Sequence, residues 1–173
     1  MRYSSPARRP CKVMSANNSS RTIAFGLLAA FCIAALAAPL PYDESADAKA
    51  AVQRTLAAAA SSHVPMLIVF GANWCEDCVA LDRALQKGQS AALIAKSFRL
   101  VKVDVGDFDR NLDLAARYGN PIEKGIPAAV VVSENNKVLY TTKAGELANA
   151  RQMSENGIYL FFKRVSQGVA GVQ

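Results

Sequence analysis

The sequence predicts an α/β domain in which helices cover both faces of a mixed β-sheet. Three observations carry this prediction. Segments with helical and strand-like patterning alternate between about residues 45 and 165. Residues 66–70 form an uninterrupted apolar run, which is typical of a central strand buried on both faces. Near the end of the chain, the β-rich runs 128–133 and 138–142 flank a polar four-residue turn, which favours an antiparallel hairpin.

The remaining elements follow from apolar spacing and from capping residues. A second strand is expected over residues 99–105. Either Asp43 or Ser45 can provide the N-cap of the first helix, and Gly119 can end the fourth. Helical spacing predicts helices over residues 45–60, 75–86, 90–97, 110–118 and 146–165.

Charge is distributed unevenly along the 173 residues. The net charge is +6, but five of the 20 basic residues precede residue 38 and no acidic residue does. The remainder holds 15 basic and 14 acidic residues. The basicity therefore belongs to the N-terminal segment, and the folded part offers no electrostatic basis for binding nucleic acid. The length suits one domain, which we expect to act as a monomer.

The N-terminal segment has the three parts of an export signal. A basic, polar stretch ends at Arg21, and an apolar stretch runs over residues 22–38. Near the end of that stretch, Ala35 and Ala37 are the two small residues that a signal peptidase recognises. We therefore expect residues 1–37 to be a cleaved signal peptide, and residues 38–173 to form a periplasmic or secreted domain with its core at about 45–165. An uncleaved membrane anchor is the less favoured alternative, because 17 apolar residues fall short of the roughly 20 that span a bilayer.

Removal of the leader reduces four cysteines to two. Cys11 and Cys32 leave with it, so Cys75 and Cys78 remain. A disulfide closing so short a loop restricts the unfolded chain little, which favours exchange chemistry over a structural staple. A zinc site would require two further Cys or His ligands, and His63 is the only histidine. We expect no metal and no cofactor.

The Cys-x-x-Cys pair follows the buried strand and opens a helix. This placement leaves Cys75 exposed at the helix start, where free N–H groups favour a thiolate, and turns Cys78 inward. Cys75 is therefore expected to be the nucleophile and Cys78 the resolving residue. Glu76 and Asp77 lie between them and disfavour the Cys75 thiolate, which predicts a reducing pair. Alternatively, these acids are simply a solvated first helical turn.

Two segments resemble thioredoxins. Residues 68–78 are similar to the strand and active-site loop of that family, and Gly125-Ile126-Pro127 is similar to its cis-proline segment. The resemblance covers roughly residues 45–165 and implies the thioredoxin fold. It further implies a cis Pro127 packed against the sulfurs, an Ile126 backbone that pairs with a substrate strand, and Trp74 as an apolar lid or a packing residue.

The sequence also departs from the family pattern. Many thioredoxins carry a buried acid six positions before the first cysteine, where this chain has Val69. The lysine that commonly accompanies the acid corresponds to Leu100, or less directly to Lys102, so both members are expected to be apolar. Proton transfer to Cys78 then requires water or another group, with Glu76 and Asp77 the nearest candidates. The loop 120–124 is longer than usual and either tunes partner choice or is ordinary variation.

These observations together predict an exported thiol–disulfide oxidoreductase that acts on protein disulfides or dithiols. The two acids beside Cys75 favour a reductase, and an exported reductase would need electrons from a membrane thiol carrier like those of the Dsb system. An oxidant or isomerase is the alternative within the same chemistry, although an isomerase usually has a second binding domain. A different alternative is a non-catalytic binding or assembly module of the cell envelope.

Overall fold

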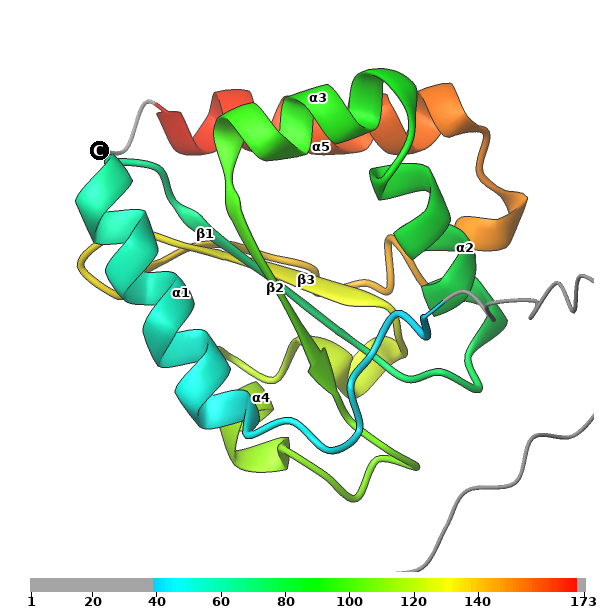
Figure 1. Ribbon diagram of the computed structural model, residues 1–173. Helices are drawn as coiled ribbons and strands as arrows, with labels where there is room; N and C mark the ends of the chain where they lie inside the picture. The colour runs from blue at the N-terminus through cyan, green and yellow to red at the C-terminus, as the bar shows by residue number, and fades with distance from the viewer. Residues whose placement is uncertain (1–38, 171–173) are drawn as a thin grey trace, which may run out of the picture. The chain divides into compact units, whose positions relative to one another are not determined.

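A computed structural model describes residues 39–170 (Figure 1). The expected signal peptide and its cleavage site lie outside this range. None of the helices within it has the length and apolar character needed to cross a bilayer. Its elements are α1 (Ala48–Ser62), β1 (Met66–Gly71), α2 (Glu76–Leu85), α3 (Gly88–Ser97), β2 (Arg99–Asp104), α4 (Leu112–Arg117), η1 (Pro121–Lys124), β3 (Ala128–Val132), β4 (Val138–Thr141), η2 (Ala150–Gln152) and α5 (Glu155–Ala170), where η denotes a 3₁₀-helix.

The four strands form one mixed sheet in the order β2-β1-β3-β4. Strand β1 runs parallel to β2 and antiparallel to β3, and β3 and β4 form the expected antiparallel hairpin. Every residue of β1 is buried, as its apolar sequence predicts for a strand at the centre of the sheet. The α/β fold class with helices on both faces is confirmed.

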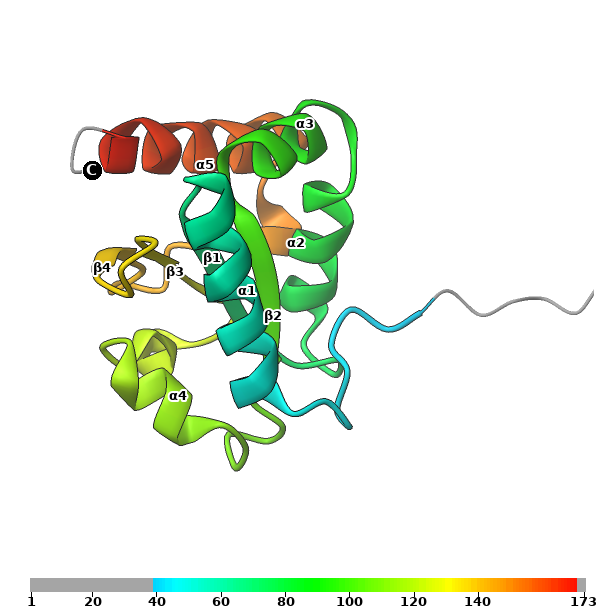
Figure 2. The same cartoon turned by 60° about the vertical axis from the view of Figure 1, so that its left-hand side comes forward.

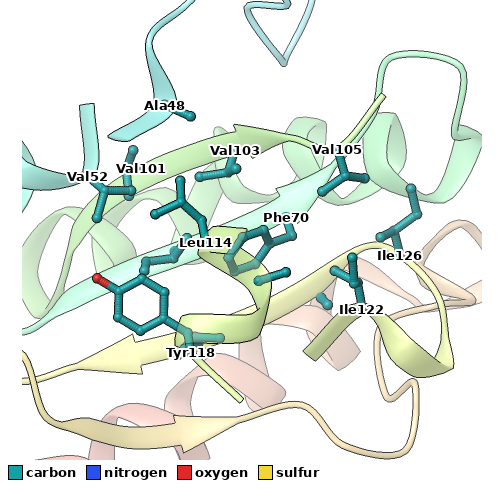
Figure 3. Close-up of a cluster of buried hydrophobic side chains, with 14 of the residues drawn as sticks. Ala48, Val52, Phe70, Val101, Val103, Val105, Leu114, Tyr118, Ile122 and Ile126 are labelled. Carbon is teal, nitrogen blue, oxygen red and sulfur yellow. The ribbon is translucent and has the colours of Figure 1, made fainter. Parts of the chain in front are cut away.

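Side-chain alternation along β1 divides the interior into two clusters. Met66, Ile68 and Phe70 face α1 and α4, whereas Leu67 and Val69 face α2, α3 and α5. Figures 1 and 2 show α3 and α5 side by side on their face of the sheet. On the other face, Phe70 lies at the centre of the cluster drawn in Figure 3. The active-site loop leaves the sheet between these two layers, at the end of β1.

The last helix begins later than expected. Residues 146–149 form turns, because Gly145 adopts a positive φ of 72° and the Glu146 carboxylate accepts hydrogen bonds from the Lys143 and Ala144 N–H groups. A new cap follows at Ser154, whose hydroxyl accepts the Gly157 N–H at 3.0 Å. Helix α5 therefore starts at Glu155, and the prediction of a helix from residue 146 is wrong.

Two other helix starts differ for local reasons. Asp47 caps α1 by accepting the Ala50 N–H at 3.0 Å, so neither Asp43 nor Ser45 is the cap. Helix α4 starts at Leu112 instead of residue 110, because Asn111 adopts the left-handed conformation with φ 52°. Gly119 has the positive φ that the sequence predicts just after the end of this helix.

Candidate redox site

Cys75 and Cys78 form a disulfide at the start of α2, with their Cα atoms 5.2 Å apart. Cys75 is the N-cap residue, and its Sγ accepts the Cys78 backbone N–H at 3.1 Å. Cys78 is fully buried and Cys75 is 7% exposed. The predicted order of exposure is therefore right, but the prediction that Cys75 stands open to solvent is wrong. Only a small part of Cys75 is therefore open to a partner in the oxidised protein.

The segment before β3 covers Cys75 from the side. The Ile126–Pro127 peptide bond is cis, and both residues are buried. The Ile126 carbonyl oxygen lies 3.7 Å from the Cys75 Sγ, so the fold brings together two motifs that are 51 residues apart.

Trp74 presents an exposed aromatic surface beside the disulfide. Its side chain is 56% exposed, and its indole N–H donates to the Gly106 carbonyl at 3.0 Å. The ring lies 6.2 Å from that of Phe108, which is also exposed. Phe108 adopts a positive φ of 62°, which is rare for an aromatic residue and holds it at the surface. Sequence reasoning missed Phe108, because its loop carries no recognisable motif.

A groove continues from Phe108 towards the loop that precedes Pro127. Leu112, Ile122 and Gly125 line it together with Phe108. Residues 121–124 of this loop form η1, and Ile122 is buried. The loop that the sequence marks as unusually long therefore contributes to a surface next to Ile126, as expected from its position before the proline.

Glu76 and Asp77 pair with Arg151 of η2 instead of facing Cys78. The Arg151 guanidinium forms an ion pair with Glu76 and lies 3.7 Å from Asp77, and the Arg151 backbone N–H donates to Asp77 at 2.9 Å. Arg151 is 74 residues from Asp77 in the chain, so no local pattern identifies it. The two acids are thus partly compensated by the Arg151 guanidinium.

Replacing Arg151 with alanine is expected to make the cysteine pair more reducing. The unpaired acids then disfavour the Cys75 thiolate more strongly, which destabilises the reduced form. For an exposed ion pair we expect a reduction potential lower by about 5–20 mV, measured by equilibration with glutathione. Arg83→Ala, which removes an exposed cation from the last turn of the same helix, is the control and should leave the potential unchanged. An equal shift in both variants would contradict the assignment.

The lysine and acid that the sequence seemed to lack are present in another arrangement. Lys102 of β2 lies opposite Val69, and its ammonium group is 2.6 Å from the Asp82 carboxylate of α2. The Asp82 side chain is only 12% exposed. Position 69 is apolar as expected, whereas Lys102, the less direct of the two lysine candidates, has an acidic partner on α2 instead of on β1. Asp82 lies four residues after Cys78, on the same face of α2.

A second carboxyl group lies at the end of β2. Asp104 is the strand partner of Gly71 and is 5% exposed. It accepts the Gly106 N–H at 3.2 Å and lies 3.5 Å from the Arg110 guanidinium. Burial is the main influence and raises the pKa of the Asp104 carboxyl, although the Gly106 N–H and Arg110 partly oppose it.

Asp104→Asn is expected to change how stability depends on pH. Because the native pKa of Asp104 is raised, the folded wild type loses stability as pH rises from the ordinary carboxyl range through that raised value. The amide does not ionise, so the variant should gain stability relative to wild type as pH rises from about 3 through the ordinary carboxyl range near 4 and above it. Urea unfolding across this range measures the difference.

Asp113→Asn is the matched comparison with the opposite sign. Asp113 is exposed and lies 2.6 Å from Lys49, and this hydrogen bond lowers the pKa of its carboxyl. A lowered carboxyl pKa stabilises the folded protein at pH values above the pKa of Asp113 in the unfolded chain. The Asp113→Asn variant should therefore lose stability relative to wild type as pH rises. If both amide variants drift in the same direction with pH, the assignment for Asp104 is wrong.

Comparison with known proteins places this geometry among thiol–disulfide enzymes. The family model described as thioredoxin-like matches residues 47–133. The crystal structure of a disulphide isomerase from Xylella fastidiosa Temecula1 is 59% identical, with a TM-score of 0.74 over 75% of this chain and 99% of that chain.

Two further structures are 19% identical. The C-terminal domain of Neisseria meningitidis DsbD, in its oxidised form, aligns with 66% of this chain and 94% of its own at a TM-score of 0.45. The structure of a DsbH oxidoreductase aligns with 90% of this chain and 95% of its own, at a TM-score of 0.48. No curated protein gives a significant match.

Proposed function

The chain belongs to the thioredoxin-like family of thiol–disulfide oxidoreductases, and from this premise we propose that it is an exported reductase of protein disulfides. The observation that carries the proposal is the Cys75–Cys78 disulfide at the start of α2, with the Ile126 carbonyl 3.7 Å from the first sulfur. A reactive sulfur and a backbone acceptor for the substrate chain lie together there.

The cycle assigns one role to each sulfur. The Cys75 thiolate attacks a substrate disulfide, forms a mixed disulfide and releases one substrate sulfur as a thiolate. The Cys78 thiolate then attacks the Cys75 Sγ, so that the second substrate sulfur leaves and the Cys75–Cys78 bond forms. Two electrons pass from the enzyme dithiol to the substrate, whose two thiolates take up the protons that the enzyme thiols released. Ile126, Pro127 and Trp74 bind the substrate around Cys75.

The charges around α2 favour the reducing direction. Glu76 and Asp77 carry two negative charges in the first turn, and Arg151 supplies one positive charge against them. The remaining negative charge opposes the favourable helix end and disfavours the thiolate. A less stabilised thiolate makes the dithiol form less stable and the pair a better reductant.

Insulin reduction and a redox titration test this proposal. Wild type should accelerate insulin precipitation by dithiothreitol, and Cys75→Ala should not exceed the uncatalysed rate. The reduction potential should lie nearer to about −270 mV, as in thioredoxin, than to about −120 mV, as in a strong oxidant. A wild type that fails to accelerate the reaction would favour the alternative of a non-catalytic binding module.

An isomerase is the second candidate, and a specific observation favours it. The 59% identical relative is described as a disulphide isomerase, and this chain covers 99% of its length. A short chain is therefore a weak argument against isomerase activity. Reactivation of scrambled ribonuclease in a glutathione buffer distinguishes a reductase from an isomerase. A reductase should accelerate this reactivation less than it accelerates the reduction of insulin.

Export and the supply of electrons are part of the same proposal. Residues 1–37 have the composition of a cleaved signal, and an exported reductase requires electrons from a membrane thiol carrier. Cell fractionation should find the protein outside the cytoplasm, with a mass that corresponds to a start at Ala38. Intact leader in membrane fractions would instead support the anchor.

A further inference from the structure

The segment before α1 runs from that helix across to the start of α2 (Figure 1). Asn73 of the active-site loop holds it there with three hydrogen bonds. The Tyr42 N–H donates to the Asn73 side-chain oxygen at 3.0 Å, and the Asn73 amide donates to the Tyr42 carbonyl at 2.8 Å and to Glu44 at 2.9 Å. Residues 39–47, which we call the strap, are thus attached to the loop that carries Trp74 and Cys75.

The strap places the Tyr42 side chain beneath the disulfide. Tyr42 is only 2% exposed and packs in the same cluster as Cys75 and Cys78. A methyl group added to Gly71 would overlap the Tyr42 hydroxyl and would lie 3.0 Å from the Cys78 Sγ. The phenol oxygen and the resolving sulfur therefore border the same small space beside Gly71. This space also explains why β1 ends in glycine.

The charged groups around this space are carboxylates with their own partners. Asp82 of α2 is paired with Lys102, and Asp104 of β2 is paired with Arg110. Burial first, and then these two carboxylates, raise the pKa of the Tyr42 hydroxyl far above its ordinary value. The phenol is consequently neutral and keeps its proton throughout the physiological range, so it is available as a hydrogen-bond donor.

We propose that the Tyr42 hydroxyl donates a hydrogen bond to the Cys78 thiolate in the reduced protein and during the resolving step. A thiolate at a fully buried sulfur is disfavoured unless a donor compensates for its lost hydration. Glu76 and Asp77 face Arg151, so they do not supply that donor. Tyr42 retains its proton throughout, and the Cys78 proton goes to solvent before the sulfur attacks Cys75.

This inference rests on the proposed reductase cycle for its kinetic consequences. In Tyr42→Phe the ring still fills its site, but the donor is absent. The rate of the resolving step near neutral pH should fall by roughly tenfold to a hundredfold, the range for a hydrogen bond to a charged group. The midpoint of the pH–rate profile should move upward by about one to two pH units.

Tyr118→Phe is the matched control. Tyr118 is also 2% exposed in the same cluster, and its hydroxyl bonds to Asn136 at 3.1 Å, away from the cysteines. Its variant loses a hydroxyl from the same apolar core without changing the surroundings of Cys78. It should keep the wild-type pH profile even if its stability falls.

A titration of Cys78 separates this inference from the reductase proposal. In a Cys75→Ser background, the Cβ chemical shift of Cys78 reports thiolate formation without any turnover. Adding Tyr42→Phe should raise the midpoint by about one to two pH units, whereas adding Tyr118→Phe should not. An unchanged midpoint in Tyr42→Phe overturns the inference, whatever the enzyme reduces. A shifted midpoint in a protein without reductase activity would refute only the proposed function.

Asn73→Ala provides a second, independent test of the placement. It removes the hydrogen bonds between the strap and the active-site loop but leaves the phenol in the chain. The Cys78 midpoint should move in the same direction as in Tyr42→Phe and by a smaller amount. A wild-type midpoint in Asn73→Ala, together with a shifted one in Tyr42→Phe, would show that packing alone holds the tyrosine and would contradict the role of the strap.

Discussion

Cys78→Ala is expected to lose catalytic turnover to the level of the uncatalysed reaction and to accumulate as covalent adducts with its substrates. The variant retains Cys75 at the start of α2, so the first attack still forms a mixed disulfide. Without the second sulfur, only an external thiol can release the substrate. Non-reducing electrophoresis should show adducts that dithiothreitol dissolves, and mass spectrometry of these adducts identifies the partners.

Two further variants make this result specific. Cys75→Ala should form no adducts, because Cys78 is fully buried and cannot reach a substrate disulfide. Arg83→Ala should behave as wild type, since it changes α2 at the end distant from the sulfurs. Equal adduct formation by the two cysteine variants would mean that the roles of the sulfurs are not divided as proposed.

Phe70→Ala is expected to reduce the free energy of unfolding by about 3–5 kcal/mol, the range for deletion of a buried phenylalanine side chain. Phe70 is fully buried in β1 and is among the largest side chains in the core. Figure 3 shows it between Leu114 and Ile122, so its removal leaves a cavity lined by two helical segments and the sheet. Against a typical total of about 5–15 kcal/mol, the loss removes a large part of the stability.

Urea unfolding followed by circular dichroism measures this loss. The control is Leu160→Ala in α5, where the side chain is 39% exposed and its truncation should cost less than about 1 kcal/mol. A change in the slope of the unfolding curve for Phe70→Ala would indicate an altered unfolded state in addition to the cavity. Comparable losses in the two variants would show that the Phe70 cluster does not dominate the core.

Local patterns are sufficient to predict most of the fold. The uninterrupted apolar run of β1 and the polar turn before β4 are both visible in contiguous stretches of sequence, so the sequence alone predicts them. The start of α5 was predicted wrongly, because local spacing is not sufficient there. The apolar residues of 146–154 suit a helix, but Gly145 and the cap at Ser154 interrupt it through hydrogen bonds that spacing does not reveal.

The redox site shows the same division between local and distant contacts. The positions of Cys75, Cys78 and Pro127 follow from motifs that the sequence displays. Arg151 and Asp82, in contrast, act through partners that are 20 or more residues away, and no motif marks them. The role of Tyr42 in the strap was missed for another reason. In the sequence Tyr42 lies in a short connector after the apolar N-terminal segment, and only the fold shows that it packs beside Gly71.

The attachment of residues 39–47 to Asn73 determines which terminus is suitable for fusing a reporter protein or an immobilisation tag. Because Tyr42 is bonded to the loop that carries Cys75, a partner joined just before residue 39 is expected to crowd the approach to the sulfurs. Helix α5 ends at Ala170, at the opposite end of the molecule from the start of α2 (Figure 1). A protein tethered to a biosensor surface through its carboxy terminus should therefore keep Cys75 and the start of α2 facing the solution.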